Sequence, residues 1–198
     1  DWHRAGRATP SHSTLCLGGY SSARLGKPVK TSGLFREFLV EAPKIVPVEM
    51  SQTAEGVKFE GAHSGYVPPF GLTHARKLSL SLDGRSLVGE DLLIALNDTT
   101  GKAAETVLSE DIDPNVDFQI RFHLHPEVDA ALDLGGTTVA IAAKSGEIWI
   151  FRHESSLFLT IEPGIYLEKN QPTPRASRQI VLSGMVNDAL TRAQWSLS

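Results

Sequence analysis

Apolar and polar residues alternate along most of the chain, which is the pattern of strands that bury one face. Between residues 76 and 82, leucines occupy positions 78, 80 and 82, and Lys or Ser occupies the positions between them. Asp83-Gly84 follows directly, and a second apolar run extends from Ser86 to Ile94. Asp and Gly both accept a positive φ in a tight turn. This stretch therefore predicts a β-hairpin centred on Asp83-Gly84.

The second half of the chain repeats this pattern and predicts a meander. Residues 128–134 and 137–143 flank Gly135-Gly136, and residues 147–151 follow a Lys-Ser-Gly turn. The remaining expected strands are short apolar runs between turn residues: 156–161, 165–167 after a turn at Pro163-Gly164, 178–182 and 194–197.

Helical periodicity is weak throughout. Residues 187–195 are compatible with a short helix of poor apolar spacing, and the polar residues 99–117 predict a loop. About a dozen short strands, with turn signals about every 8–12 residues, predict an all-β fold, namely an antiparallel β-sandwich.

Length, charge and cysteine content limit the number of domains and the kinds of partner. A chain of 198 residues is expected to form one domain, and its net charge of −4 argues against a nucleic-acid partner. The single Cys16 excludes an internal disulfide, and its flanking leucines suggest a strand residue and not a nucleophile. No apolar run reaches the roughly 18 residues of a membrane span. The first residue is Asp1, so we expect a piece of a longer protein.

The first candidate for chemistry is the segment 121–126, Arg-Phe-His-Leu-His-Pro. If it is a strand, His123 and His125 share a face about 7 Å apart, because two residues each rise about 3.3 Å. Together with Arg121, they are candidates for binding an acidic substrate, and two imidazoles with a third ligand would suit a metal. The plainer alternative is a polar strand face with two solvated histidines.

Two further segments combine histidine with other reactive groups. His63 and Tyr66 are followed by His74 and Arg76, and a Tyr near a cation acts as acid or base if its pKa is lowered. The alternative is a tight loop with a packed Tyr. His12, in residues 7–14, is either a ligand to a metal or an exposed loop residue. There is no phosphate-binding glycine motif and no nucleophile elbow.

Taken in order, these segments resemble the C-terminal domain of the heparinase II/III-like family of polysaccharide lyases. Residues 7–14, Arg-Ala-Thr-Pro-Ser-His-Ser-Thr, resemble the family's Arg-x-Thr-x-x-His-Asn-Thr, with Ser13 in place of Asn. Residues 63–66 resemble His-Asp-Gly-Tyr with Ser64 in place of Asp, residues 74–76 resemble His-x-Arg, and residues 121–126 match Arg-Phe-His-Leu-His-Pro. The resemblance extends from Trp2 to Trp195.

The resemblance implies a fold and a reaction. Its members join an N-terminal α-helical toroid to a β-sandwich of the super-sandwich type, so residues 1–198 would be that sandwich without the toroid. They cleave uronic-acid-containing polysaccharides, glycosaminoglycan-like or alginate-like, by β-elimination. The partners implied are an acidic polysaccharide and the toroid of the same parent chain.

The resemblance also implies incomplete sites. The catalytic Tyr and the group that neutralises the uronate lie on the toroid, and a Gly-His-x-His segment precedes the region matched here. His63, Tyr66, His74 and Arg76 are then candidates to line or support the cleft. Some relatives hold a structural zinc, for which His12 would be one ligand and the co-ligands would lie upstream of Asp1. The isolated chain is therefore expected to be inactive.

Two alternatives to the lyase interpretation stay open. One is a non-catalytic carbohydrate-binding or scaffolding sandwich, in which Trp149 would be an exposed platform for sugars. The other is a metal-dependent enzyme built on His123 and His125. The periplasm and the cytoplasm of a bacterium both stay open, because one cysteine suits either.

Overall fold

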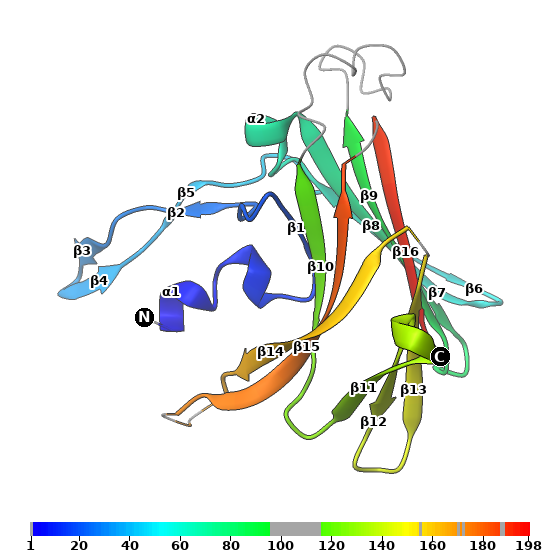
Figure 1. The fold of residues 1–198 in the computed structure, drawn as a ribbon. Helices are drawn as coiled ribbons and strands as arrows, with labels where there is room; N and C mark the ends of the chain where they lie inside the picture. The colour runs from blue at the N-terminus through cyan, green and yellow to red at the C-terminus, as the bar shows by residue number, and fades with distance from the viewer. Residues whose placement is uncertain (1, 96–115, 155, 170, 172, 187–188) are drawn as a thin grey trace.

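The chain folds into two packed antiparallel sheets in a computed structural model that describes residues 2–95, 116–154, 156–169, 171, 173–186 and 189–198. Figure 1 shows the two layers, with the N-terminal segment on the outer side of the smaller one. The smaller sheet has four strands, in the order β1 (Leu15–Leu17), β10 (Asp117–His123), β15 (Arg175–Met185) and β14 (Phe158–Tyr166). The predicted all-β sandwich is confirmed.

The larger sheet has eight strands. They lie in the order β11 (Asp129–Asp133), β12 (Thr138–Ala142), β13 (Ile148–His153), β16 (Leu190–Leu197), β9 (Leu87–Ala95), β8 (Leu72–Ser81), β7 (Gly56–His63) and β6 (Val48–Thr53). The last strand of the chain, β16, thus lies inside the sheet, where it pairs with β9 on one side and β13 on the other. Within the sheet, β16 joins the β6–β9 half to the β11–β13 half.

Both predicted hairpins form. β8 and β9 pair antiparallel around Asp83-Gly84, with Leu80 opposite Leu87 and with Gly84 at a φ of 68°. β11, β12 and β13 form the predicted meander, and the short turn η2 (Leu134–Gly136) connects its first two strands. The expected loop at 99–117 lies almost wholly outside the described residues, and Asp117 already begins β10.

Three local expectations are wrong. β14 continues through Pro163-Gly164 without a turn, because β14 is an edge strand and its Pro needs no ladder partner on the open side. Residues from Leu190 onward form β16 and not a helix. Trp149 is partly buried and packs against the core, so it is not an exposed platform.

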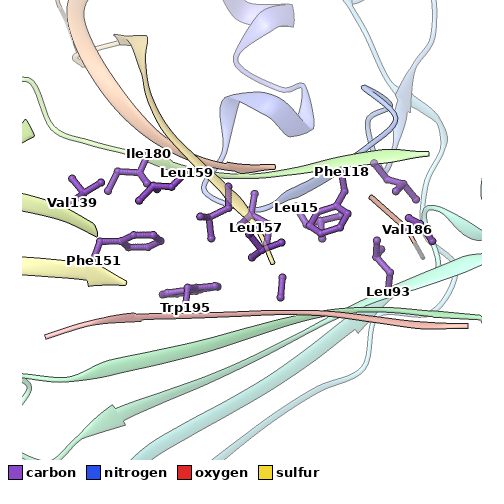
Figure 2. Packing of buried hydrophobic residues seen from close by; sticks show 14 of the residues in the cluster. Leu15, Leu93, Phe118, Val139, Phe151, Leu157, Leu159, Ile180, Val186 and Trp195 are labelled. Carbon is purple, nitrogen blue, oxygen red and sulfur yellow. The ribbon is translucent and has the colours of Figure 1, made fainter. Parts of the chain in front are cut away.

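Inward-facing residues of both sheets form one apolar core, which Figure 2 shows between the two layers. Phe118 on β10 and Phe151 on β13 are among its largest buried side chains. Trp195 lies across β9 at Gly89, where a Cβ would come within 2.1 Å of the indole. Only glycine therefore fits at position 89.

A long arm leaves the sandwich between β1 and β6 and consists of two small strand pairs, visible on the left of Figure 1. The arm strands are β2 (Arg24–Leu25), β3 (Val29–Thr31), β4 (Leu34–Arg36) and β5 (Leu39–Glu41). Large apolar side chains on it are exposed, among them Leu34 at 62% and Phe35 at 72%. An ion pair between Glu37 and Arg4 connects the arm to the N-terminal helix α1 (Trp2–Ala5).

Helices are few and short. Besides α1, they are η1 (Thr9–Ser11), α2 (Val67–Phe70) and η2, and no helix in the described part of the chain is long and apolar enough to cross a membrane.

Candidate functional site

The segment with His12 crosses the outer side of the four-stranded sheet and is fixed at its base. Thr9, in η1, is buried. Its backbone N–H donates to Ser21 Oγ at 3.0 Å, and its hydroxyl oxygen accepts from the backbone N–H of Ser22 at 3.0 Å. These bonds anchor the start of the loop that carries His12, whose own side chain is exposed. We call residues 9–13 the His12 loop.

Side chains from the other motif segments bind the same loop. Arg76 Nη1 donates to the carbonyl of Ser13 at 2.6 Å. The backbone N–H of His123 donates to Ser13 Oγ at 3.0 Å, and His123 Nε2 lies 3.0 Å from the carbonyl of Pro10. A carbonyl only accepts, so His123 carries a proton on Nε2. Three segments that lie far apart in the sequence are thus brought together at the His12 loop.

Tyr66 is a buried support and does not reach the surface. It precedes α2, and its hydroxyl donates to the carbonyl of Leu15 at 3.0 Å, on the open edge of β1. Burial raises the pKa of Tyr66 well above its usual value. The lowered pKa that acid or base chemistry would need is therefore not found in this arrangement.

His63 and His74 lie opposite each other on β7 and β8 and form a hydrogen-bonded chain. The backbone N–H of Gly65 donates to His63 Nδ1 at 3.2 Å, His63 Nε2 lies 3.2 Å from His74 Nδ1, and His74 Nε2 lies 2.7 Å from Asp91 Oδ1. Since Gly65 donates to Nδ1, a neutral His63 must carry its proton on Nε2. His74 then accepts on Nδ1 and donates to Asp91 from Nε2.

Gly65 makes this order of donors possible. A Cβ at position 65 would lie 2.4 Å from the carbonyl oxygen of Ser22, so a larger residue cannot bring its N–H to the same place. Burial and, to a smaller extent, the nearby His74 together lower the pKa of His63 to about 4. Both ring nitrogens of His63 are therefore committed, and the ring stays neutral at ordinary pH.

Asp91 is the centre of the buried cluster, which we define as His63, His74, Arg76, Asp91 and Trp195. Its carboxylate accepts from His74, from Arg76 Nε at 2.8 Å and Nη2 at 3.0 Å, and from Trp195 Nε1 at 3.0 Å. Burial alone raises the pKa of Asp91, but the bond from His74 and the charge of Arg76 outweigh it and hold the pKa below its usual value. The cluster is a satisfied buried ion pair network.

The remaining candidates are dispersed over the outer face of the small sheet. β10 ends at His123, so His125 lies beyond the strand and the expected shared strand face is not formed. The rings of His125 and Tyr166 pack in a T-shaped arrangement, with centroids 4.9 Å apart. Arg121 is paired with Glu162 at 3.0 Å, and burial lowers the pKa of His123.

A pocket of about 480 Å³ lies beside the His12 loop, between α1 and the outer face of β14 and β15. Figure 2 shows the blue N-terminal segment on the opposite side of the small sheet from the core. Residues from η1 and from the end of β10 complete the wall: Pro10, Ser11, His123 and Leu124. A second pocket of about 510 Å³, mostly apolar, borders His63 and the base of the arm.

A metal site does not follow from these residues alone. Over the part of the chain that the structure describes, no group of three or more His, Cys, Asp or Glu side chains is placed to hold an ion. His12 lies near His123 and opposes its protonation, but no third ligand joins them. The described residues therefore do not by themselves form the structural zinc site that the resemblance implies, nor a metal site at His123 and His125.

Sequence reasoning missed Asp91 and Trp195. A signal for Asp91 exists, because it lies in phase with Leu87, Leu93 and Ala95 on β9 and so has to face inward. A charged residue in the buried phase of a strand requires partners. No sequence pattern near Trp195 indicates that it binds Asp91, which lies 104 residues earlier in the chain.

Comparison with known proteins agrees with this fold. The family model described as "Heparinase II/III-like, C-terminal" matches residues 1–196. The FtsZ-localized protein C of Caulobacter vibrioides is 28% identical over 193 residues, which are 97% of this chain and 32% of that protein. The chain thus spans about a third of this curated relative.

Two solved structures share the fold at low identity. The heparan sulfate lyase HepC of Pedobacter heparinus superimposes with a TM-score of 0.65 at 13% identity, covering 99% of this chain and 25% of that one. A heparinase III superimposes with a TM-score of 0.60 at 14% identity, covering 96% and 23%. With the family model matching nearly its whole length, the chain belongs to the heparinase II/III-like family, as its C-terminal domain.

Proposed function

We propose that this chain is the sandwich domain of a polysaccharide lyase that cleaves uronic-acid-containing chains by β-elimination. The observation that carries the proposal is the convergence of the family-like segments on the exposed His12 loop beside a pocket. The structural similarity to a heparan sulfate lyase and to a heparinase III supports a fold shared between this chain and those two proteins. The proposed partners are an acidic polysaccharide and an α-helical domain of the same protein.

The reaction needs three groups. One neutralises the uronate carboxylate, a base removes the proton from C5, and an acid gives a proton to the leaving oxygen as the C4–O bond breaks and a C4–C5 double bond forms. Charge neutralisation is central, because negative charge develops next to the carboxylate. His12, with Arg121, His123 and His125 on the outer sheet face, is proposed to contact the substrate.

The buried cluster has a different proposed role. Both nitrogens of His63 are engaged, and Tyr66 donates to Leu15 from within the core. Together with His74 and Arg76, these residues position the His12 loop and do not exchange protons with substrate. The base is then supplied by the helical domain, and residues 1–198 alone are proposed to be inactive.

The test compares the full protein with residues 1–198 on heparin, heparan sulfate and alginate. We expect unsaturated uronate, followed by its ultraviolet absorbance, from the full protein and none from residues 1–198. His12→Ala should lower turnover in the full protein. Lys58→Ala, which removes an exposed side chain on β7, is the control and should leave turnover unchanged. Product from residues 1–198 alone would refute the incomplete site, and no product from the full protein on any acidic polysaccharide would refute the lyase proposal.

A second function, a non-catalytic scaffolding sandwich, is favoured by one observation. The arm exposes Leu34 and Phe35 next to Lys30 and Arg36, which suits contact with another macromolecule. A curated relative is named for its localisation with FtsZ and not for an enzymatic activity. If Leu34→Ser with Phe35→Ser abolishes the biological role of the full protein while lyase activity is absent or unchanged, scaffolding is the better description.

A further inference from the structure

Four strands lie at the edges of the two sheets, and three of them carry features that block pairing with another strand. β14 contains Pro163, and β11 begins and ends with the exposed Asp129 and Asp133. On β1, the carbonyl of Leu15 is already bound by Tyr66. The fourth edge is β6, at the right of Figure 1. Its residues 48–53 are all described, and they include no proline, no bulge and no charged side chain on the inner face. β6 is therefore the edge at which another strand can add.

The open side of β6 presents main-chain groups at every second residue. The N–H of Ala62 on β7 donates to the carbonyl of Pro47 at 3.0 Å, just before β6 begins. Because antiparallel strands exchange hydrogen bonds at alternate residues, the odd-numbered residues of β6 direct their main-chain groups toward β7. The groups directed to the open side are those of Val48, Met50 and Gln52.

The same even-numbered residues place their side chains on the inner face of the larger sheet, where the smaller sheet does not cover them. Val48 is 60% exposed there, and Met50 is 69% exposed. Met50 lies opposite Phe59 of β7, and Phe59 lies opposite Leu78 of β8, which packs against the core. One row across three strands is thus apolar, and it ends at the open edge on Met50.

The outer face at this edge has an unbalanced pattern of charges. Glu49 lies directly opposite Glu60, a position in which like charges repel. Lys77 lies 3.9 Å from Glu60, so it compensates that residue and not Glu49. Lys58 is exposed and lies opposite Ser51. Among the described residues of the chain, neither Lys58 nor Glu49 has an ion-pair partner. One acid and one base are therefore available at the edge.

We propose that β6 pairs antiparallel with β6 of a second copy of this chain, about a two-fold axis that passes between the two Met50 residues. A two-fold axis perpendicular to the sheet keeps both inner faces on one side, so one residue must lie opposite its own copy. Centring on Glu49 would oppose two like charges, and centring on Ser51 would place Met50 opposite the polar Gln52. Centring on Met50 avoids both.

This register uses the free main-chain groups and continues the apolar row. Met50 pairs with Met50, and Val48 pairs with Gln52 in both directions, so each pair joins residues whose N–H and C=O point to the open side. On the inner face, the row that runs from Leu78 through Phe59 to Met50 continues through the same residues of the second copy in reverse order. The larger sheets of the two copies thereby form one continuous sheet.

The register also pairs the charges that one copy leaves uncompensated. Glu49 lies opposite the second copy's Ser51, and the second copy's Lys58 lies on the next strand of the same row. Strands are about 4.8 Å apart, so about 10 Å separates the backbones at Glu49 and the second copy's Lys58. The two side chains together span that distance across the small Ser51. This charge complementarity favours a second copy over an unrelated strand.

The dimer does not depend on the proposed lyase activity. The second copy extends the larger sheet beyond β6, whereas the His12 loop lies on the outer side of the smaller sheet. Lys58→Ala can therefore weaken the dimer while the turnover of each copy stays unchanged.

The first test traps the pair in the full protein by cysteine cross-linking. In this register the Cα atoms of the two Met50 residues lie about 5.5 Å apart, a distance that a disulfide spans. The two Ser51 residues lie diagonally, about 7–8 Å apart, which is too far. Met50→Cys should therefore form a covalent dimer under mild oxidation, and Ser51→Cys, its matched control, should not. Equal cross-linking of both variants, cross-linking of Ser51→Cys alone, or none would overturn the proposed pairing.

The second test measures the dimer dissociation constant of the full protein by sedimentation. Glu49→Lys and Lys58→Glu should each raise it at least about tenfold, because each replaces attraction by repulsion, and the double variant should restore it. Glu147→Lys, an exposed turn residue beside β13, is the control for the charge change and should have no effect. A full protein that stays monomeric up to about 0.1 mM, or a dimer insensitive to both charge reversals, would overturn the second copy as the partner of β6. Thermal unfolding of each variant checks that it is folded.

Discussion

Two groups of histidines in this molecule lie in opposite surroundings. His63 and His74 belong to the buried cluster, where each ring nitrogen has a partner and Asp91 accepts the last hydrogen bond of the chain, from His74 Nε2. His12 is exposed on the loop, and His123 borders a pocket with one nitrogen bound to Pro10. All four lie in the segments that resemble the lyase family, yet His63 and His74 have both ring nitrogens engaged, whereas the side chain of His12 is exposed.

This contrast shows that a residue in a family-like motif need not be one that contacts the substrate. Arg76 touches both groups, since it binds Asp91 through Nε and Nη2 and Ser13 through Nη1. Arg76 therefore links the buried cluster to the His12 loop through hydrogen bonds. We therefore expect changes in the cluster to appear first in stability and changes on the loop to appear first in turnover or binding.

The largest effect is expected from Asp91→Ala. Removing the carboxylate leaves the Arg76 guanidinium and the Trp195 N–H without their acceptor, and breaking such a buried pair costs about 3–5 kcal/mol. Denaturant unfolding followed by tryptophan fluorescence measures the loss. Glu60→Ala is the matched control, because Glu60 is exposed at 58% and 3.9 Å from Lys77, so its pair contributes at most about 1 kcal/mol. Similar losses in both variants would contradict the central role of Asp91.

Tyr66→Phe should have the next largest effect. The ring stays, but the carbonyl of Leu15 loses the hydroxyl that covers it, at a cost of about 1–3 kcal/mol for a buried unsatisfied group. The same removal at Tyr20, which is 59% exposed, should cost much less. The two variants are compared by the shift of the unfolding midpoint, and an equal shift would mean that the Leu15 bond is unimportant.

The pH dependence of stability should distinguish His63. Its pKa is about 4 in the folded chain and near 6.5 when unfolded, so the unfolded state binds more protons between these values. Stability should therefore fall as pH is lowered from about 6.5 to 4, and Asp91 adds a further loss below about 4 as its lowered pKa is reached. His63→Gln should flatten the upper part of this profile. If the stability of this variant still falls with the same slope between about pH 6.5 and 4, a group other than His63 takes up the proton.

The smallest effect on stability is expected from His12→Ala. An exposed loop side chain changes the free energy of unfolding by no more than about 0.5 kcal/mol. In the full protein the same variant should lower kcat/KM on its polysaccharide by about tenfold, equivalent to about 1.4 kcal/mol. A large loss of stability with normal turnover would reverse the roles given to the loop and the cluster.

The fold was predictable where local chemistry decides it. The hairpin at Asp83-Gly84 follows from turn residues and the leucine alternation beside them. The path of β14 through Pro163 was not, because a proline is accepted or rejected according to whether its strand lies at an edge, and edge position is set by the whole sheet. The short strands of the arm, β2 to β5, were not predicted either.

The candidate site divides in the same way. His63, His74 and Arg76 were found as a group because they lie within 14 residues and resemble family motifs. The bond between Trp195 and Asp91 spans 104 residues and depends on β16 lying next to β9. The burial of Tyr66 depends on β1, which lies far from it in the sequence. Tertiary pairings of this kind leave no local trace.

The place of β16 has a consequence for how the protein is made. Domains fold as units while the chain emerges from its N-terminus. Here the strand that joins the two halves of the larger sheet is synthesised after every strand of both halves, and it also brings the Trp195 donor to Asp91. Until residues 190–197 have emerged from the ribosome, both halves expose an open strand edge. A message truncated before the codon for residue 190 would therefore yield a chain with two unjoined half-sheets, and such a product is a target for aggregation or proteolysis.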